Sequence, residues 1–220
     1  MNMLCAMASL GTTPVNLTTD WRAAEAPPEA PPTVPSAMPV DVSWIIPAVR
    51  LPPNSTQTAY QLELWNSSHL VWQSEIATGS ETSATLPAAN ASMCSFRWRV
   101  RAATQQQQLG GWSAFAPFDT APTAADWASS EWIGRHDQLR AELPWPFAPG
   151  ADAQNITRAR AHAIGLGAFY LHPNGVRVSD HHMDPPPSAY PSPPACSTFD
   201  VGALTRPAPR HVLGLEPGTD

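Results

Sequence analysis

The chain has 220 residues, of which 14% are charged and 26 are proline, and its net charge at pH 7 is −6. This length allows one large or two small domains. The negative charge argues against a nucleic-acid partner, which would require clustered positive charge to bind phosphates. Because the sequence contains no lysine, chemistry that needs a Schiff-base lysine or a P-loop lysine is excluded.

The first strand is expected in residues 14–22, which read PVNLTTDWR. Residues 26–39 are too rich in proline for a helix or for the interior of a sheet, so they predict an extended linker or a loop between strands. We therefore assign residues 1–35 to an N-terminal segment with a proline-rich linker. The first ten residues lack the basic region and the long apolar core of a signal peptide.

Residues 36–121 show short strands at regular spacing, separated by turn signals. The alternation is clearest in residues 95–103, where Phe96, Trp98 and Val100 face one side and the intervening arginines, Arg97, Arg99 and Arg101, face the other. The expected strands are 40–46, 58–65, 69–76, 82–87, 95–103 and 111–120. This spacing is typical of an all-β sandwich of the fibronectin type III or immunoglobulin kind.

Four tryptophans in this region have two interpretations. The simpler one is that all four lie in the core, and the alternative is that they form a platform for a sugar ring. The residues are Trp44, Trp65, Trp98 and Trp112.

Residues 122–220 predict a second β-sandwich. A short helical turn is expected in ADWASSEW (125–132), and strands in 139–145, 199–204 and 211–216. Residues 158–180 predict a hairpin in which Val176 and Val178 return along a second strand after Asn174-Gly175, a dipeptide typical of hairpin turns.

About five strands are expected, whereas a jelly roll has eight, so the second module is expected to be jelly-roll-like and incomplete. The fold class is all-β, with two sandwich modules in tandem.

Taken in order, these segments resemble the N-terminal region of α-L-rhamnosidases, which are multidomain glycoside hydrolases. The first module carries the resemblance in DVSWII, QTAYQLEL, VWQSEIAT, FRWRVRAA, WSAFAPFDT and ADWASSEWIG. The second carries it in LRAEL, ARAHAIGLGAFYLHPNGVRVSD, DPPPSAY and TFDVGAL. The resemblance covers roughly residues 36–216. It implies accessory β domains that precede a helical catalytic barrel, and that barrel, with its carboxylates, is missing from these residues.

The sequence departs from the family in the second module. Pro187-Ser188-Ala189 precedes Tyr190 where the family has Gly-Trp-Thr, so an aromatic that could stack on a sugar is absent. Asp200-Val201-Gly202 stands where the family has Asp-Val-Thr.

Catalytic residues are not expected in this chain. Asp180 and Asp184 lie close in sequence, but on a loop that is expected to be exposed, where burial would not raise a pKa as glycoside hydrolysis requires. The candidates for weak carbohydrate contacts are Asn174, Asp180, Asp184 and Tyr190. No cofactor is expected.

No metal site is expected either. Adjacent side chains of an extended segment point to opposite faces, so His181 and His182 are poor candidates for ligands of one ion. Three widely spaced cysteines match no Cys-x-x-Cys spacing and allow at most one disulfide: Cys5, Cys94 and Cys196.

The expected function is that of a non-catalytic region of an α-L-rhamnosidase-like enzyme, with a structural role and a rhamnose-containing carbohydrate as candidate ligand. The full-length enzyme would hydrolyse terminal α-L-rhamnose, and this chain alone would be inactive.

The alternative is a free-standing secreted interaction or adhesion protein. Five Asn-x-Ser/Thr sequons fit a secreted chain: Asn16, Asn54, Asn66, Asn90 and Asn155. No segment approaches the ~20 apolar residues of a membrane span.

Overall fold

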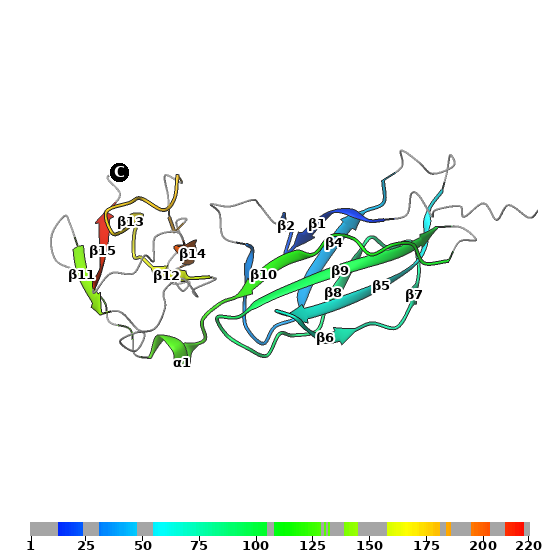
Figure 1. Cartoon of the computed structure of the whole chain (residues 1–220), viewed down its shortest axis with the longest axis horizontal. Helices are drawn as coiled ribbons and strands as arrows, with labels where there is room; N and C mark the ends of the chain where they lie inside the picture. The colour runs from blue at the N-terminus through cyan, green and yellow to red at the C-terminus, as the bar shows by residue number, and fades with distance from the viewer. Residues whose placement is uncertain are drawn as a thin grey trace, which may run out of the picture. The chain divides into compact units, whose positions relative to one another are not determined.

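A computed structural model of the chain divides into two compact units, one of residues 1–24 and 31–128 and the other of residues 25–30 and 129–220. In the part of the chain that the structure describes, both are built from β-strands, with one short helix, α1 (Ala124–Trp127) (Figure 1). The described residues are 13–23, 31–47, 55–104, 108–128, 130, 132, 139–144, 158–180, 184–185, 195–202 and 210–217. Across these segments, no helix has the length and apolar character that crossing a lipid bilayer requires.

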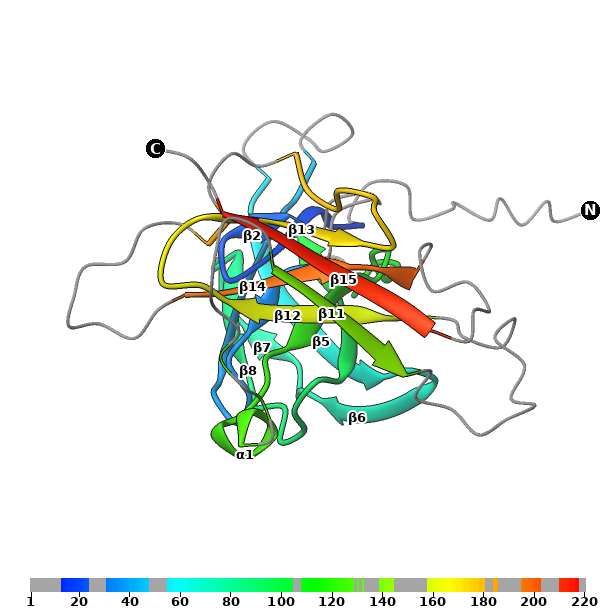
Figure 2. The ribbon, with the colours of Figure 1, turned by 90° about the vertical axis from the view of Figure 1, so that its left-hand side faces the viewer.

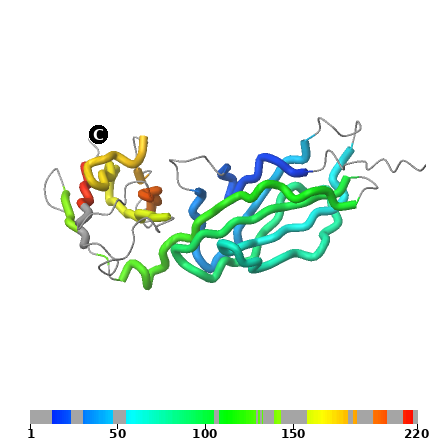
Figure 3. The backbone as a smooth tube through the Cα atoms, in the orientation of Figure 1, coloured from blue at the N-terminus to red at the C-terminus, as the bar shows by residue number. Residues whose placement is uncertain are grey.

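Unit 1 is a sandwich of two sheets. The first sheet has the order β2-β1-β4-β8, formed by β2 (Arg22–Ala23), β1 (Val15–Thr19), β4 (Val40–Ile45) and β8 (Ser83–Leu86). The second has the order β3-β10-β9-β5-β6, with β7 also paired to β5. Its strands are β3 (Thr33–Val34), β10 (Ala116–Thr120), β9 (Ser95–Thr104), β5 (Gln57–Asn66), β6 (His69–Gln73) and β7 (Ala77–Thr78). The long strands β5 and β9 run side by side (Figure 3).

The core of unit 1 lies between the two sheets, as the alternation in the sequence predicts. Val40, Val42 and Trp44 of β4 are buried, and their neighbours Asp41 and Ile45 are exposed. The opposite sheet contributes buried residues from β5, β9 and β10: Leu62, Leu64, Phe96, Trp98, Val100, Ala116 and Phe118. Burial of these apolar side chains is the main term that stabilises the sandwich.

Two described parts of the predicted N-terminal segment, residues 13–23 and 31–35, contribute strands to this sandwich. Strand β1 confirms a strand within residues 14–22, although it ends at Thr19, and it pairs antiparallel with β4. Strand β3 lies within the segment predicted as a linker and pairs parallel with β10, with Thr33 opposite Asp119 and Val34 opposite Thr120. Proline content predicted an extended backbone here correctly, but an extended segment can also occupy the edge of a sheet.

The described residues of unit 2 form two small sheets (Figure 2). One has the order β11-β15-β13 and the other pairs β12 with β14. The strands are β11 (Leu139–Pro144), β12 (Arg160–Ile164), β13 (Phe169–Pro173), β14 (Cys196–Asp200) and β15 (Arg210–Pro217). Phe169 and Leu171 of β13 pack with Phe199 and Val201 to form the core of this unit.

The predicted hairpin of unit 2 is only partly correct. Asn174 and Gly175 do form a turn with positive φ angles, 51° and 82°. Residues 176–180, however, are not a strand, and β13 pairs with β15, a strand about 40 residues later in the chain. The return segment keeps one strand-like bond, from N of Val178 to O of Leu171 at 3.1 Å. Turn chemistry therefore located the reversal but not the partner strand.

Candidate functional site

The two carboxylates considered for catalysis differ in their exposure to solvent. Asp180 is exposed, as expected. Asp184 is only 9% exposed, so our expectation of an exposed loop is wrong for this residue. Its Oδ2 accepts a hydrogen bond from Oγ of Ser179 at 2.7 Å, and its backbone O accepts one from N of Phe169 at 2.7 Å. Asp184 thus ties its loop to the start of β13.

Asn174 is also engaged within the protein. Its backbone N donates to O of Val212 at 2.7 Å, and its side-chain Oδ1 accepts from N of Val212 at 3.0 Å. Together these two bonds hold the turn against β15. Tyr190 lies outside the described residues. The carbohydrate contacts proposed for Asn174, Asp180, Asp184 and Tyr190 stay a prediction.

The structure describes three of the five sequon asparagines. Asn16 and Asn90 are exposed, and Asn66 is half-buried at the end of β5. Asn54 and Asn155 lie outside the described residues, as do His181, His182 and Cys5. Among the described residues, no group of three or more His, Cys, Asp and Glu side chains is arranged to hold a metal ion.

The tryptophans predicted for the core divide into two pairs. Trp44 and Trp98 are buried there, which confirms the simpler interpretation for them. Trp65 and Trp112 are half-buried and lie against the arginines of the other face of β9, so the core interpretation is wrong for this pair.

These two tryptophans belong to a stack of alternating arginines and aromatic rings. The guanidinium carbon of Arg99 lies 5.5 Å from the ring centre of Trp65 and 4.8 Å from that of Trp112, and Arg101 lies 4.6 Å from Trp112. Arg97 lies 4.2 Å from the ring centre of Phe115. At such distances each cation attracts the electron-rich face of its ring, so the stack stabilises the outer face of the second sheet.

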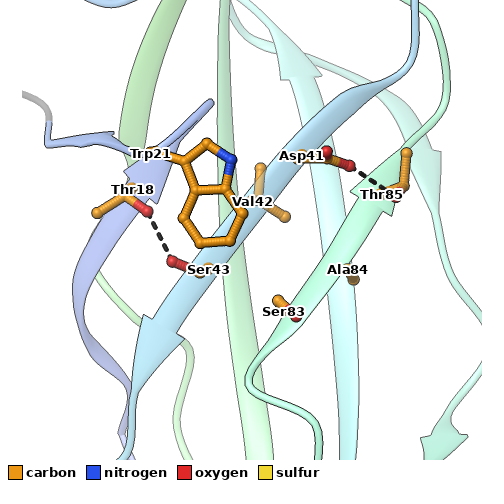
Figure 4. A pocket seen from close by; sticks show the side chains of 8 residues that line it. All are labelled: Thr18, Trp21, Asp41, Val42, Ser43, Ser83, Ala84 and Thr85. Carbon is orange, nitrogen blue, oxygen red and sulfur yellow. Dashed lines mark hydrogen bonds between the residues drawn. The ribbon is translucent and has the colours of Figure 1, made fainter.

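A separate cavity lies on the outer face of the first sheet, below the tip of the β1–β2 hairpin (Figure 4). Its volume is about 310 Å³, near the lower end of the range for small-molecule sites. The lining residues come from the hairpin and from strands β4 and β8: Thr18, Trp21, Asp41, Val42, Ser43, Ser83, Ala84 and Thr85.

The hairpin holds Trp21 over this cavity in a strained conformation. Asp20 and Trp21, the two central residues of the turn, have φ angles of 49° and 64°. A two-residue turn with positive φ at both positions is the type I′ turn, which favours Asn-Gly. A bulky residue in this region costs of order 1–3 kcal/mol. The backbone N of Asp20 donates to O of Asp41 at 2.7 Å, which fixes the turn to β4.

Below the indole, hydroxyl groups form a row across three strands. Thr18 of β1 is opposite Ser43 of β4, and Ser43 is opposite Ser83 of β8. The hydroxyls of Thr18 and Ser43 share a hydrogen bond of 2.6 Å. Beside this row, Oγ1 of Thr85 donates to Oδ1 of Asp41 at 2.8 Å. The cavity therefore combines an aromatic face with polar groups that donate and accept hydrogen bonds.

Sequence reasoning missed this site because it assigned residues 14–22 to one strand. The structure ends β1 at Thr19 and turns at Asp20 and Trp21. The dipeptide Asp20-Trp21 is not a typical sequence for such a turn, so no clear local signal marked the reversal. Trp21 is 77% exposed.

Comparison with known proteins identifies both units. The family model of the Rha78A-like, N-terminal immunoglobulin domain matches residues 31–124, and that of the α-L-rhamnosidase N-terminal domain matches residues 154–215. No curated sequence matches the chain.

Solved structures show the same fold over nearly the whole chain. An α-L-rhamnosidase from Dictyoglumus thermophilum is 22% identical, with a TM-score of 0.75, and the match covers 96% of this chain and 26% of that one. A native α-L-rhamnosidase from Aspergillus terreus is 20% identical, with a TM-score of 0.67, and the match covers 94% and 24%. The chain thus spans about a quarter of the length of these proteins. It carries, in tandem, two N-terminal β domains of α-L-rhamnosidase-like proteins, the immunoglobulin-like one first.

Proposed function

We propose that this chain is the non-catalytic N-terminal region of a glycoside hydrolase that removes terminal α-L-rhamnose, and that its two units support a catalytic module encoded elsewhere in the full protein. The observation that carries the proposal is the order of the two domain matches along one chain. Asn174, Asp180, Asp184 and Tyr190 remain candidates for carbohydrate contacts in the second unit.

The environments of the buried carboxylates support a structural role. Inverting hydrolysis needs two carboxyl groups about 6.5–9.5 Å apart that are free to act as acid and base. Glu63 accepts a hydrogen bond from Nε of Arg99 at 2.7 Å, and Asp119 accepts one from Oγ of Ser95 at 2.6 Å. Asp184 is bonded to Ser179. Each of these groups stabilises its own unit.

The test is hydrolysis of an aryl α-L-rhamnoside by purified 1–220. We expect no release of rhamnose, and measurable release that follows the protein through purification would contradict the proposal. Sequencing of the transcript beyond the codon for Asp220 gives a second test. We expect it to encode a helical barrel, and a stop codon there would favour the alternative below.

The alternative, a free-standing interaction protein, is favoured by one surface. Strand β6 is at the edge of its sheet, and Leu70 and Val71 on it are exposed. Exposed apolar residues on an edge strand can pair with another chain. Light scattering of purified 1–220 and of Val71→Lys separates the two functions, because only an interaction surface predicts self-association that the lysine abolishes.

A further inference from the structure

Trp21, which lies over the cavity, has two features that packing does not explain. Trp21 is 77% exposed, so its ring gains little from burial. Its backbone is in the region of positive φ, where glycine would be unstrained. An exposed side chain that also strains its backbone stabilises the fold poorly, and residues of this kind cluster at ligand sites.

The lining of the cavity limits the chemistry of a ligand. The indole presents a flat apolar face, and the groups below it are hydroxyls and one carboxylate, that of Asp41. No lysine, arginine or histidine is among the described residues that line the cavity, which argues against an anionic ligand such as a phosphate. A flat ring with an apolar face and hydroxyls at its edge matches both parts of the site.

We propose that Trp21 and the hydroxyl row of Thr18, Ser43 and Ser83 bind one neutral sugar ring, which stacks on the indole. Asp41 accepts a hydrogen bond from Thr85 through Oδ1 and so offers Oδ2 to a sugar hydroxyl. The Ser83 hydroxyl has no hydrogen-bond partner among the described residues, which leaves it free to bond the ligand. The choice of rhamnose as the sugar to test rests on the proposed function.

The test is a titration of purified 1–220 with methyl α-L-rhamnopyranoside, followed by saturation-transfer NMR, with methyl β-D-glucopyranoside as the comparison sugar. We expect weak binding, with a Kd of roughly 1 mM or above, as is reasonable for one stacked ring. Trp21→Gly is expected to weaken binding at least about tenfold, and Ser83→Ala is expected to weaken it a few-fold. Trp132→Ala is the matched control, because Trp132 is 70% exposed and does not line the cavity.

A thermal melt of the same variants separates a binding role from a structural one. Trp21→Gly is expected to keep or raise the Tm, because glycine relieves the positive φ angle. A Tm lowered by several degrees, or unfolding of the variant, would show that the indole serves the fold and would overturn the proposal.

Two further outcomes are decisive. Binding that Trp21→Gly leaves unchanged, or no binding of either sugar, also overturns the proposal. Binding of the glucoside in place of the rhamnoside keeps the site and contradicts only the choice of sugar. The transcript and hydrolysis tests above do not depend on Trp21, so failure of this inference and failure of the proposed function remain distinguishable.

Discussion

The indole Nε1 of Trp98 donates a hydrogen bond of 2.9 Å to Oγ1 of Thr19. Trp98 belongs to β9 and Thr19 to β1, so the bond crosses the core and joins the two sheets of unit 1. Both residues are almost completely buried, at 0% and 1% exposure. A buried polar group without a partner is costly, so this bond matters more than a hydrogen bond at the surface.

We expect Thr19→Val to lower the free energy of unfolding by about 1–3 kcal/mol, because valine keeps the shape of the side chain but leaves the indole N–H unpaired. Urea denaturation measures this change. Thr82→Val is the control at an exposed position, where the expected change is within about 0.5 kcal/mol. Equal effects at the two positions would mean that the bond between the sheets contributes nothing.

The stack of arginines and aromatic rings gives a second prediction, at Glu63. This residue is 5% exposed and accepts hydrogen bonds from Arg99 at 2.7 Å, Trp65 at 2.9 Å and Gln73 at 3.0 Å. Glu63→Gln removes the charge that pairs with Arg99, so we expect a loss of about 1–3 kcal/mol in urea denaturation. The Arg99 side chain is 24% exposed, and solvent keeps the loss below that of a fully buried pair.

Glu142→Gln is the control for this experiment. Glu142 pairs with Arg140 at 2.8 Å, but the two side chains are largely exposed, and exposed pairs contribute only about 0–1 kcal/mol. If Glu142→Gln lowered the free energy of unfolding as much as Glu63→Gln, the stack would not stabilise the protein more than an exposed ion pair does.

The turn of unit 2 gives a third prediction. Asn174→Gly tolerates the positive φ angle but removes the acceptor of the Val212 N–H. Asn174→Ala removes the same acceptor and also strains the backbone at the positive φ angle. We expect the Tm to fall in the order Asn, Gly, Ala, with a loss of about 1–2 kcal/mol for alanine. Hydrogen exchange at the Val212 amide should become faster in both variants. An amide that stays protected in Asn174→Gly would show that the side-chain bond is not formed in solution.

The short helix gives a prediction about pH. Hydrogen bonds from Oγ1 and N of Thr123, at 2.6 and 2.7 Å, hold the pKa of Asp126 below its ordinary value. Because the pKa of Asp126 is lower in the folded protein, this contact stabilises the turn fully at pH values above the ordinary pKa of about 3.9. The stabilisation is lost as the pH falls through the pKa of the folded state. A carboxyl-carbon NMR titration should report the lowered pKa, and Thr123→Val should raise it. A pKa that Thr123→Val leaves unchanged would assign the shift to another cause.

Period-two alternation predicted most of unit 1 from the sequence. It placed Val40, Val42 and Trp44 in the core correctly, since each strand has one buried face. The same rule explains the error at Trp65: it follows Leu64, a buried residue of β5, so its side chain must point to the other face. The core interpretation of Trp65 therefore conflicts with the alternation of its own strand.

Features that depend on distant pairing were not predictable in this way. Strand β13 was expected to pair with the residues just after its turn, but it pairs with β15. The burial of Asp184 results from its bonds to Ser179 and Phe169, which no local pattern encodes. The cavity under Trp21 likewise requires the register of β1, β4 and β8, so composition and motifs alone could not reveal it.

The parallel pairing of β3 with β10 has a consequence for synthesis on the ribosome. Thr33 pairs with Asp119, 86 residues later in the chain. At about 5–20 residues per second, roughly 4–17 s pass between translation of these two strands. Until β10 leaves the exit tunnel, β3 lacks the strand with which it pairs in the folded protein, so this edge of the sandwich can form only late in synthesis.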